Sequence, residues 1–288
     1  MSGPKEKLKE AWSLIRKGLR LDTPVPLGKY LGCHHVYGAA KLVGGKLIPT
    51  AENDRSATHR TIKYDMSDFL KSCVARYQEL AGPKGANLRK AITPYVDVAM
   101  DYDVHATPAG GQPPPSGELG AIASKVLMKV LYAARIARFD LLRPVGFLAR
   151  RVTKWDTYCD RALHKLMCYI NSTLDVCMWG WCGDQPKDLR LALFCDSDFA
   201  GCKETTRCTS GVFLALVGPS TFIPLSAVSK RQTAASHSTP EAEIVAADLG
   251  IRTEGLPALC LWEFLLDRTV LCVLCEDNEA GIRILETG

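Results

Sequence analysis

Residues 191–217 read LALFCDSDFAGCKETTRCTSGVFLALV and hold two apolar segments around a polar one. The segments 191–196 and 211–217 are short and rich in Leu, Val and Phe, which is typical of buried strands. The pattern continues with a third strand at 221–228, a helical stretch at 240–266 and a fourth strand at 270–275. Pro257 should divide the helical stretch, because an interior proline removes a hydrogen bond. This β-β-β-α-β order predicts a mixed sheet with flanking helices, an α/β (α+β) fold.

The chain before residue 190 is expected to be mainly helical. Apolar residues recur at helical spacing in segments 5–20, 66–80, 121–142, 145–152 and 156–171. A short strand is expected at 29–33. The Gly44-Gly45 pair predicts a hairpin over 41–48, because a two-residue turn needs positive φ angles. The segment 180–187 is expected to break regular structure before the strands begin.

Clustered proline and glycine in residues 107–120 predict a linker. The linker suggests a division of the chain into separate parts. These are an N-terminal part at 1–106, the linker at 107–120, a helical region at 121–185 and a strand-rich domain at 190–288.

Composition excludes several classes of protein. The 288 residues carry 36 Lys and Arg against 31 Asp and Glu, a formal charge of +5, and 47% are hydrophobic. These averages argue against a disordered, collagenous or coiled-coil chain. Lys and Arg interrupt the most apolar stretch, and the N-terminus lacks the apolar block of a signal peptide, so neither membrane insertion nor secretion is expected. The 12 cysteines should then be free thiols.

Three acidic residues are predicted to meet at one edge of the sheet. Asp196 and Asp277 each end an apolar strand, and Glu243 lies in the first turns of the intervening helix. Thr239-Pro240 supplies an N-cap hydroxyl followed by proline, which favours a helix start there. Divalent cations such as Mg²⁺ take oxygen ligands, so the arrangement suits a metal site. A single strand-end aspartate is more often a capped turn, and the pattern alone leaves both interpretations open.

The same region resembles the ribonuclease H domain of copia-type retrotransposon polyproteins in four motifs. FCDSDFAGCKETTRCTSG (194–211) resembles the family's D-A-D-W-A-G followed by S-T-S-G. The other three are SAVSKRQ (226–232), similar to S-W-S-S-K-K-Q, STPEAE (238–243), similar to S-S-T-E-A-E, and CEDNEAGI (275–282), similar to C-D-N-Q-S-A-I. The motifs follow the family's order, and the resemblance implies a ribonuclease H-like fold for residues 190–288.

The upstream part resembles the reverse transcriptase of the same elements. KYLG (29–32) is similar to K-F-L-G, RFDL (138–141) to R-P-D-I, and RALHKLMCYINST (161–173) to R-I-L-R-Y-L-K-G-T. The resemblance implies a remnant of the palm end, thumb and connection. The polymerase signature Y-x-D-D is absent, since Tyr95-Val-Asp-Val98 has valine at the second aspartate, so polymerase activity is not expected.

The resemblance assigns Asp196, Glu243 and Asp277 to three of the family's four metal-binding carboxylates. It implies hydrolysis of the RNA strand of an RNA–DNA hybrid with two Mg²⁺ or Mn²⁺ ions. Glu243 is preferred to Glu241 because an apolar helical run follows it directly, and Asp198 is expected to be structural. The fourth carboxylate would follow the last strand beyond a further helix. A retroelement product is expected in the cytoplasm or nucleus, with the rest of the polyprotein as a partner.

Nucleic-acid contacts are expected from Lys230, Arg231 and Gln232 just beyond the third strand, and from Ser238 and Thr239. A solvated basic turn and a simple helix cap explain the same residues as well. Two further hypotheses stay open. In the first, the chain is a catalytically inactive nucleic-acid-binding or structural remnant of the polyprotein. In the second, its upstream part is an independent helical domain that binds a partner.

Two cysteine-containing motifs are expected to be structural. Cys272-Val-Leu-Cys275 has the spacing of a redox pair but lies inside an apolar strand rather than at a helix start. Cys33-His34-His35 lacks a second pair of ligands at zinc-site spacing.

Overall fold

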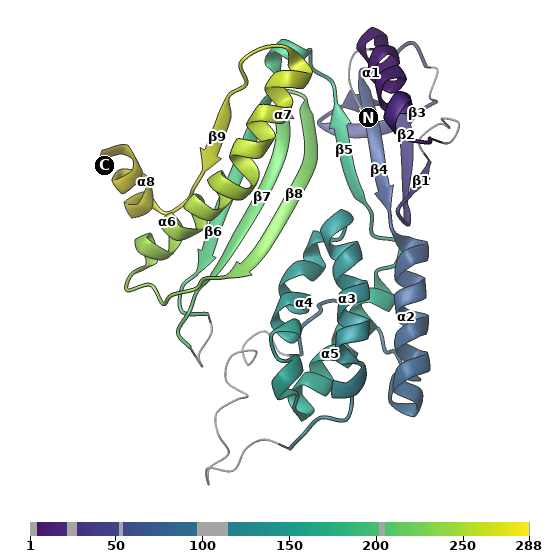
Figure 1. Ribbon diagram of the computed structural model, residues 1–288, viewed down its shortest axis with the longest axis vertical. Coiled ribbons are helices and arrows are strands. Elements are labelled where there is room, and N and C mark those ends of the chain that lie inside the picture. The colour runs from purple at the N-terminus through teal and green to yellow at the C-terminus, as the bar shows by residue number, and fades with distance from the viewer. Residues whose placement is uncertain (1–4, 22–27, 52–53, 97–114, 202–204, 288) are drawn as a thin grey trace.

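The computed structural model describes residues 5–21, 28–51, 54–96, 115–201 and 205–287. A nine-stranded mixed sheet extends through the upper part of the molecule, and a helical body lies below it (Figure 1). The strand order is β1-β2-β4-β5-β8-β7-β6-β9, with β3 beside β2. Neighbouring strands are antiparallel except β6 and β9, which are parallel.

The described strands are β1 Lys29–Tyr30, β2 Cys33–Val43, β3 Lys46–Thr50, β4 His59–Asp65, β5 Met178–Cys182, β6 Arg190–Asp198, β7 Thr209–Gly218, β8 Thr221–Arg231 and β9 Cys272–Cys275. The described α-helices are α1 Lys5–Gly18, α2 Ser67–Ala81, α3 Gly120–Ile136, α4 Leu142–Ala149, α5 Thr157–Ser172, α6 Thr239–Gly250, α7 Leu256–Leu266 and α8 Glu279–Thr287. None of these helices is long and apolar enough to cross a membrane. Residues 107–114 of the expected linker lie outside the described residues.

Helices α2 to α5 form the helical body around a core that includes Leu70, Leu127, Leu163 and Leu166, all fully buried. Helices α3 to α5 occupy the expected helical region at 121–185, but the chain before residue 190 is not mainly helical as expected, because it also forms the five strands β1 to β5. The helix expected at 121–142 is wrong at its end, because α3 stops at Ile136. Arg138 follows with its guanidinium turned into the protein, where it bonds to the carbonyl oxygen of Thr173, and the chain leaves the helical path there.

The C-terminal region has the expected β-β-β-α-β order. Helices α6 and α7 pack on one face of β6 to β9 through Leu191, Leu193, Val212 and Leu214. The helical stretch is interrupted by a π-helical turn at Ile251–Gly255, and Pro257 lies in the first turn of α7, which confirms the predicted division. The mixed α/β architecture predicted from the sequence is therefore present.

Two predictions for the strands are wrong. The segment 180–187 was expected to break regular structure, yet residues 178–182 form β5 between β4 and β8. Gly180 acts there as a packing residue, because an added Cβ would lie 3.3 Å from methyl groups of both Ile62 and Ile223. The strand expected at 29–33 is two residues long, since Leu31 and Gly32 both take positive φ angles and turn the chain into β2.

The hairpin predicted at Gly44-Gly45 is confirmed. Both glycines take positive φ angles, +57° and +77°, and Val43 pairs with Lys46 across the turn. These are the signs that a two-residue turn of mirror-image type requires, because it matches the twist of the two strands.

Strand β5 joins the parts of the chain on either side of the expected boundary at 185–190 into one sheet. Trp181 pairs with Phe222 of β8, and on the other side β5 pairs along β4. His59 of β4 is buried, and its Nε2 lies 2.7 Å from Oγ of Ser220 in the turn between β7 and β8. The upstream and C-terminal regions therefore share backbone pairing and a buried side-chain bond.

Candidate active site at the ends of strands β6 and β9

The parallel pairing of β6 and β9 brings two predicted site residues to the same edge of the sheet. Phe194 pairs with Cys275, so Asp196 and Asp277 each lie two residues beyond a paired position. Side chains two residues apart in a strand share a face, and both aspartates are exposed. The two aspartates are therefore neighbours because of the register between β6 and β9, although they lie far apart in the sequence.

Helix α6 supplies the third predicted carboxylate. Oγ of Ser238 accepts the backbone N–H of Glu241 at 3.3 Å, which caps the helix and fixes where its first turns point. Glu243, one turn further, is 4% exposed. Within the described part of the chain its Oε2 is buried without a hydrogen-bond partner.

Glu276 is a fourth carboxylate that the sequence analysis did not select. It lies directly after β9 and before Asp277, and it is the charged group that acts most strongly on Glu243 of α6. Its Oε1 accepts the backbone N–H of Asn278 at 3.1 Å, and its Oε2 is buried without a partner among the described residues. The local signal for it was limited to an acidic side chain directly beside Asp277, and that signal does not show that the side chain is buried.

The electrostatics of Glu243 show how close these groups are. Burial, followed by the negative charges of Glu276, Asp196 and Asp277 in that order, raises the pKa of Glu243 from 4.5 to about 7. The backbone N–H of Ser197 lowers this pKa but does not offset the other effects. Glu276, rather than either predicted aspartate, is thus the strongest charged neighbour of Glu243.

The carboxylates fit a hard divalent cation in chemical type but do not converge on one point. Among the described residues, no group of three or more His, Cys, Asp or Glu side chains is arranged to hold a metal ion. The two unpartnered buried oxygens of Glu243 and Glu276 are the ligand atoms that such a cation prefers. Exposed Asp196 and Asp277 can change rotamer, whereas Glu243 is held by packing. A metal site here therefore needs movement of the two aspartates toward the glutamates.

No protein-family model, curated protein or solved structure matches the chain. The chemistry of this edge is therefore argued from its own geometry and from the motifs quoted above.

The predicted nucleic-acid-binding residues differ in their exposure to solvent. Lys230 and Arg231 do not follow the third strand but form its last two residues, opposite Ser210 and Thr209. Strand β8 is longer than expected because β7 continues to pair with it. Lys230 is exposed, as are Ser238 and Thr239 at the start of α6. These exposed groups remain accessible to a phosphate.

Gln232 has a different position from the one predicted. Its side chain is 6% exposed, and its Nε2 donates to the carbonyl oxygen of Ala242 at 2.9 Å and to Oγ of Ser210 at 3.1 Å. Its Oε1 accepts the hydroxyl of Ser236 at 3.1 Å. The amide therefore fastens the start of α6 to β7, and we assign it to positioning rather than to phosphate contact.

Asp198 and Glu241 are both engaged locally. Asp198 accepts the backbone N–H of Thr209 and pairs with Arg143 of α4 at 3.1 Å, which supports the structural interpretation. Glu241 is exposed and accepts the backbone N–H of His237 at 2.7 Å. Of the two glutamates, Glu243 alone is buried against the sheet edge that carries Asp196, Glu276 and Asp277, which we call the carboxylate edge.

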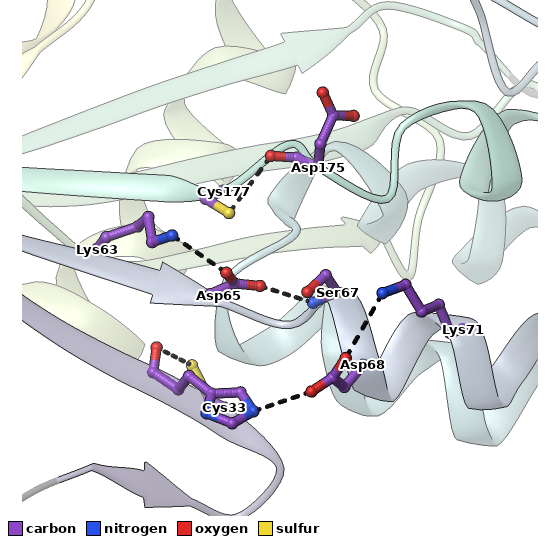
Figure 2. Close-up of polar contacts among 9 residues, drawn as sticks. Cys33, Lys63, Asp65, Ser67, Asp68, Lys71, Asp175 and Cys177 are labelled. Carbon is purple, nitrogen blue, oxygen red and sulfur yellow. Dashed lines mark hydrogen bonds and ion pairs between the residues drawn. The ribbon is translucent and has the colours of Figure 1, made fainter.

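The Cys33-His34-His35 motif is distributed around the start of α2. Figure 2 shows Cys33 near Asp65 and Asp68, where Lys63 pairs with Asp65 at 3.2 Å. His34 Nε2 lies 3.2 Å from Oδ2 of Asp68, and burial raises the pKa of the Cys33 thiol. These contacts join β2 and β4 to α2, as a structural interpretation requires.

The Cys272 and Cys275 side chains lie half-buried in β9. Burial and the neighbouring Cys275 raise the pKa of Cys272, so its thiolate is disfavoured.

Proposed function

We propose that the chain is a metal-dependent endoribonuclease that cleaves the RNA strand of RNA–DNA hybrids, as part of a copia-type retrotransposon polyprotein. The observation that supports this proposal is the pair of unpartnered buried oxygens on Glu243 and Glu276 beside Asp196 and Asp277. An ionised carboxylate that is buried without a partner is costly, and a bound cation or a proton relieves that cost.

Asp196, Glu243 and Asp277 would hold Mg²⁺ or Mn²⁺, with Glu276 as an additional ligand. When bound, a pair of such ions supplies an activated water and stabilises the leaving oxygen of the phosphodiester. The role of the protein itself is to position the ligands. Glu243 approaches from α6 and the two aspartates from the sheet edge, and the Gln232 amide keeps α6 in place.

Glu243 also determines how the site depends on pH. With its pKa raised to about 7, a substantial fraction of this carboxyl is protonated at neutral pH. Cation binding must displace that proton, since the oxygen that carries it is the ligand. Cleavage should therefore increase as pH rises through 7. Lys230, Ser238 and Thr239 are placed at exposed positions from which they can contact phosphates of the hybrid.

The test is cleavage of an end-labelled RNA–DNA hybrid with Mg²⁺ or Mn²⁺. Asp196→Asn, Glu243→Gln and Asp277→Asn should each reduce the rate by about 100-fold or more, the scale expected when a metal site is disrupted. Glu241→Gln is the matched control, because it lies on the same helix but outside the carboxylate edge. It should retain the wild-type rate.

The alternative function is hybrid binding without cleavage, as an inactive remnant. The exposed positions of Lys230, Ser238 and Thr239 suit it, because phosphate contacts need no bound cation. Fluorescence anisotropy with the same labelled hybrid distinguishes the two. Tight binding with no cleavage in either cation, and equal behaviour of Glu243→Gln and wild type, would overturn the nuclease proposal.

A further inference from the structure

A second candidate site lies in the helical body, on elements that do not contribute to the carboxylate edge. A cavity of about 530 Å³ opens between α2, the turn at Gly82–Gly85, residues 89–96 and α5. Its volume lies within the range of small-molecule sites, roughly 300–1,000 Å³. Its lining is strongly basic and includes Lys84, Arg89, Lys90, Arg161 and Lys165.

Most of these cations are not neutralised by the protein. Lys84 pairs with Glu118 at 2.5 Å. In the described part of the chain, no ion pair involves Arg89, Lys90, Arg161 or Lys165. The basic side chains border one hollow, so their like charges repel one another and an anion bound among them is stabilised.

Among the described residues, Asp160 is the one acidic side chain that lines the cavity, and its oxygens are already used. Oδ1 accepts the indole N–H of Trp155 at 2.7 Å and the backbone N–H of Leu119 at 2.9 Å, and Oδ2 accepts that of Glu118 at 2.8 Å. Asp160 therefore organises the start of α3 instead of pairing with the basic side chains around it.

His164 adds a polar group with a defined donor. Its Nδ1 lies 2.9 Å from the hydroxyl of Tyr77, which is fully buried. Burial raises the pKa of Tyr77, so the phenol keeps its proton and can donate it to Nδ1. In the tautomer in which Nδ1 accepts from Tyr77, the imidazole N–H is on Nε2 and is a donor on a residue that lines the cavity.

The rest of the lining is apolar and includes Ala91, Val96, Leu119 and Cys168. A ligand that suits both parts combines an anionic end with an apolar or ring-shaped end. Arg and Lys bind phosphate through charge-assisted hydrogen bonds, and several cations around one point suit a di- or triphosphate better than a carboxylate.

We infer that this cavity binds a small phosphate-bearing molecule of nucleotide size. A nucleic-acid strand is the less favoured ligand, because the basic side chains come from three segments and surround a hollow. Strand-binding surfaces instead arrange cations along a groove that follows the backbone. The inference is independent of the nuclease proposal, since no residue is shared between the two sites.

The test is isothermal titration of the full chain at fixed ionic strength with ATP, tripolyphosphate, adenosine and a 12-nucleotide DNA as probes. ATP and tripolyphosphate should bind and adenosine should bind at least about tenfold more weakly, because charge-assisted bonds carry the affinity. The variant Arg161→Gln/Lys165→Gln should lose at least about tenfold in ATP affinity. Lys125→Gln, an exposed lysine on α3 outside the cavity, is the control and should bind as the wild type does.

Equal thermal unfolding midpoints of the two variants will establish that loss of binding is not loss of fold. Tyr77→Phe provides a second measurement, because it keeps the ring but removes the hydroxyl bonded to His164; it should weaken ATP binding by a few fold. No binding of either polyphosphate, or the same loss in Lys125→Gln, would overturn the inference. Tighter binding of the DNA than of ATP would also overturn the inference, and would indicate that the basic surface binds a nucleic-acid strand. Hybrid cleavage should be unchanged in all of these variants.

Discussion

Glu243 titrates near neutral pH, and this links the stability of the protein to pH. Burial and the neighbouring carboxylates raise its pKa from 4.5 to about 7. The unfolded chain therefore releases the proton first as pH rises, and ionisation of the folded state is penalised. Stability that is present below pH 4.5 is lost between 4.5 and 7, by about 3 kcal/mol at most.

Glu243→Gln should remove this penalty. The glutamine is neutral at every pH, so at pH 8 the variant should exceed the wild type in free energy of unfolding by about 2–3 kcal/mol. Near pH 4.5 the two should be almost equal. Urea unfolding at both pH values, without divalent cations, measures the difference, with Glu241→Gln as the control. A difference that stays constant with pH would show that the charge of Glu243 is not responsible.

Arg138 is the largest fully buried side chain, and it carries a charge. Its Nε and Nη2 donate to Asp140 at 2.9 and 2.8 Å, and its Nη1 donates to the carbonyl oxygen of Thr173 at 2.9 Å. Arg138→Ala removes these bonds and leaves Asp140 with the Tyr169 hydroxyl but without its ion pair, which should cost about 3–5 kcal/mol in urea unfolding. Arg135→Ala, exposed in the last turn of α3 just before Arg138, should cost less than about 0.5 kcal/mol. Similar losses in both variants would contradict a specific role for the buried ion pair.

At the scale of elements, the sequence predicts those parts whose side chains pack on one face only. Helix α5 has an uninterrupted helical period, and it begins and ends within one residue of the expected bounds. Strand β5 could not be predicted in this way, because Gly180 is read as a breaker when its packing partners are unknown. Those partners, Ile62 and Ile223, come from distant parts of the chain. A glycine that permits close packing and one that ends a strand are identical in the sequence.

The start of α6 illustrates the same limit for polar residues. Gln232 follows two basic residues and has the local pattern of an exposed turn, yet it is buried and bonded to Ala242 and Ser210. Gln232→Ala should leave both acceptors without this donor and destabilise the fold by about 1–3 kcal/mol. Hydrogen exchange in the first turn of α6 should accelerate more than in α5. As a control, Thr233→Ala at the exposed neighbouring residue should change neither the stability nor the exchange rate. Unchanged exchange in Gln232→Ala would contradict the role of Gln232 in fastening α6 to β7.

At the scale of the molecule, the candidate site depends on which strands become neighbours. The sequence identifies Asp196, Glu243 and Asp277 as separate residues at the ends of elements. Only the parallel register of β6 and β9 brings the two aspartates together, and only the placement of α6 turns Glu276 toward Glu243. Long-range pairing of this kind is not encoded in local periodicity. For this reason the fourth carboxylate was missed.

The continuous sheet also determines how the molecule should unfold. The upstream region and the C-terminal strands are joined by β5, by the bond between His59 and Ser220, and by the ion pair of Arg143 with Asp198. The ring of Phe139, in the short 3₁₀ turn Phe139–Leu141, adds an edge contact with Phe213 of β7 at 6.2 Å between centroids. Separate domains would lack such shared buried groups, so opening of one part should expose the other.

We therefore expect the two parts to unfold as one cooperative unit. Native-state hydrogen exchange should give backbone amides of α5 and of β7 the same opening free energy, equal to that of global unfolding. His59→Ala removes a buried side chain that bonds across the junction, and should lower the opening free energy of β7 by more than that of α5. His237→Ala, at an exposed histidine before α6, is the control and should leave the two equal. If the wild type already shows two different opening free energies, the upstream and C-terminal regions are energetically separate, and the pairing through β5 contributes too little to couple them.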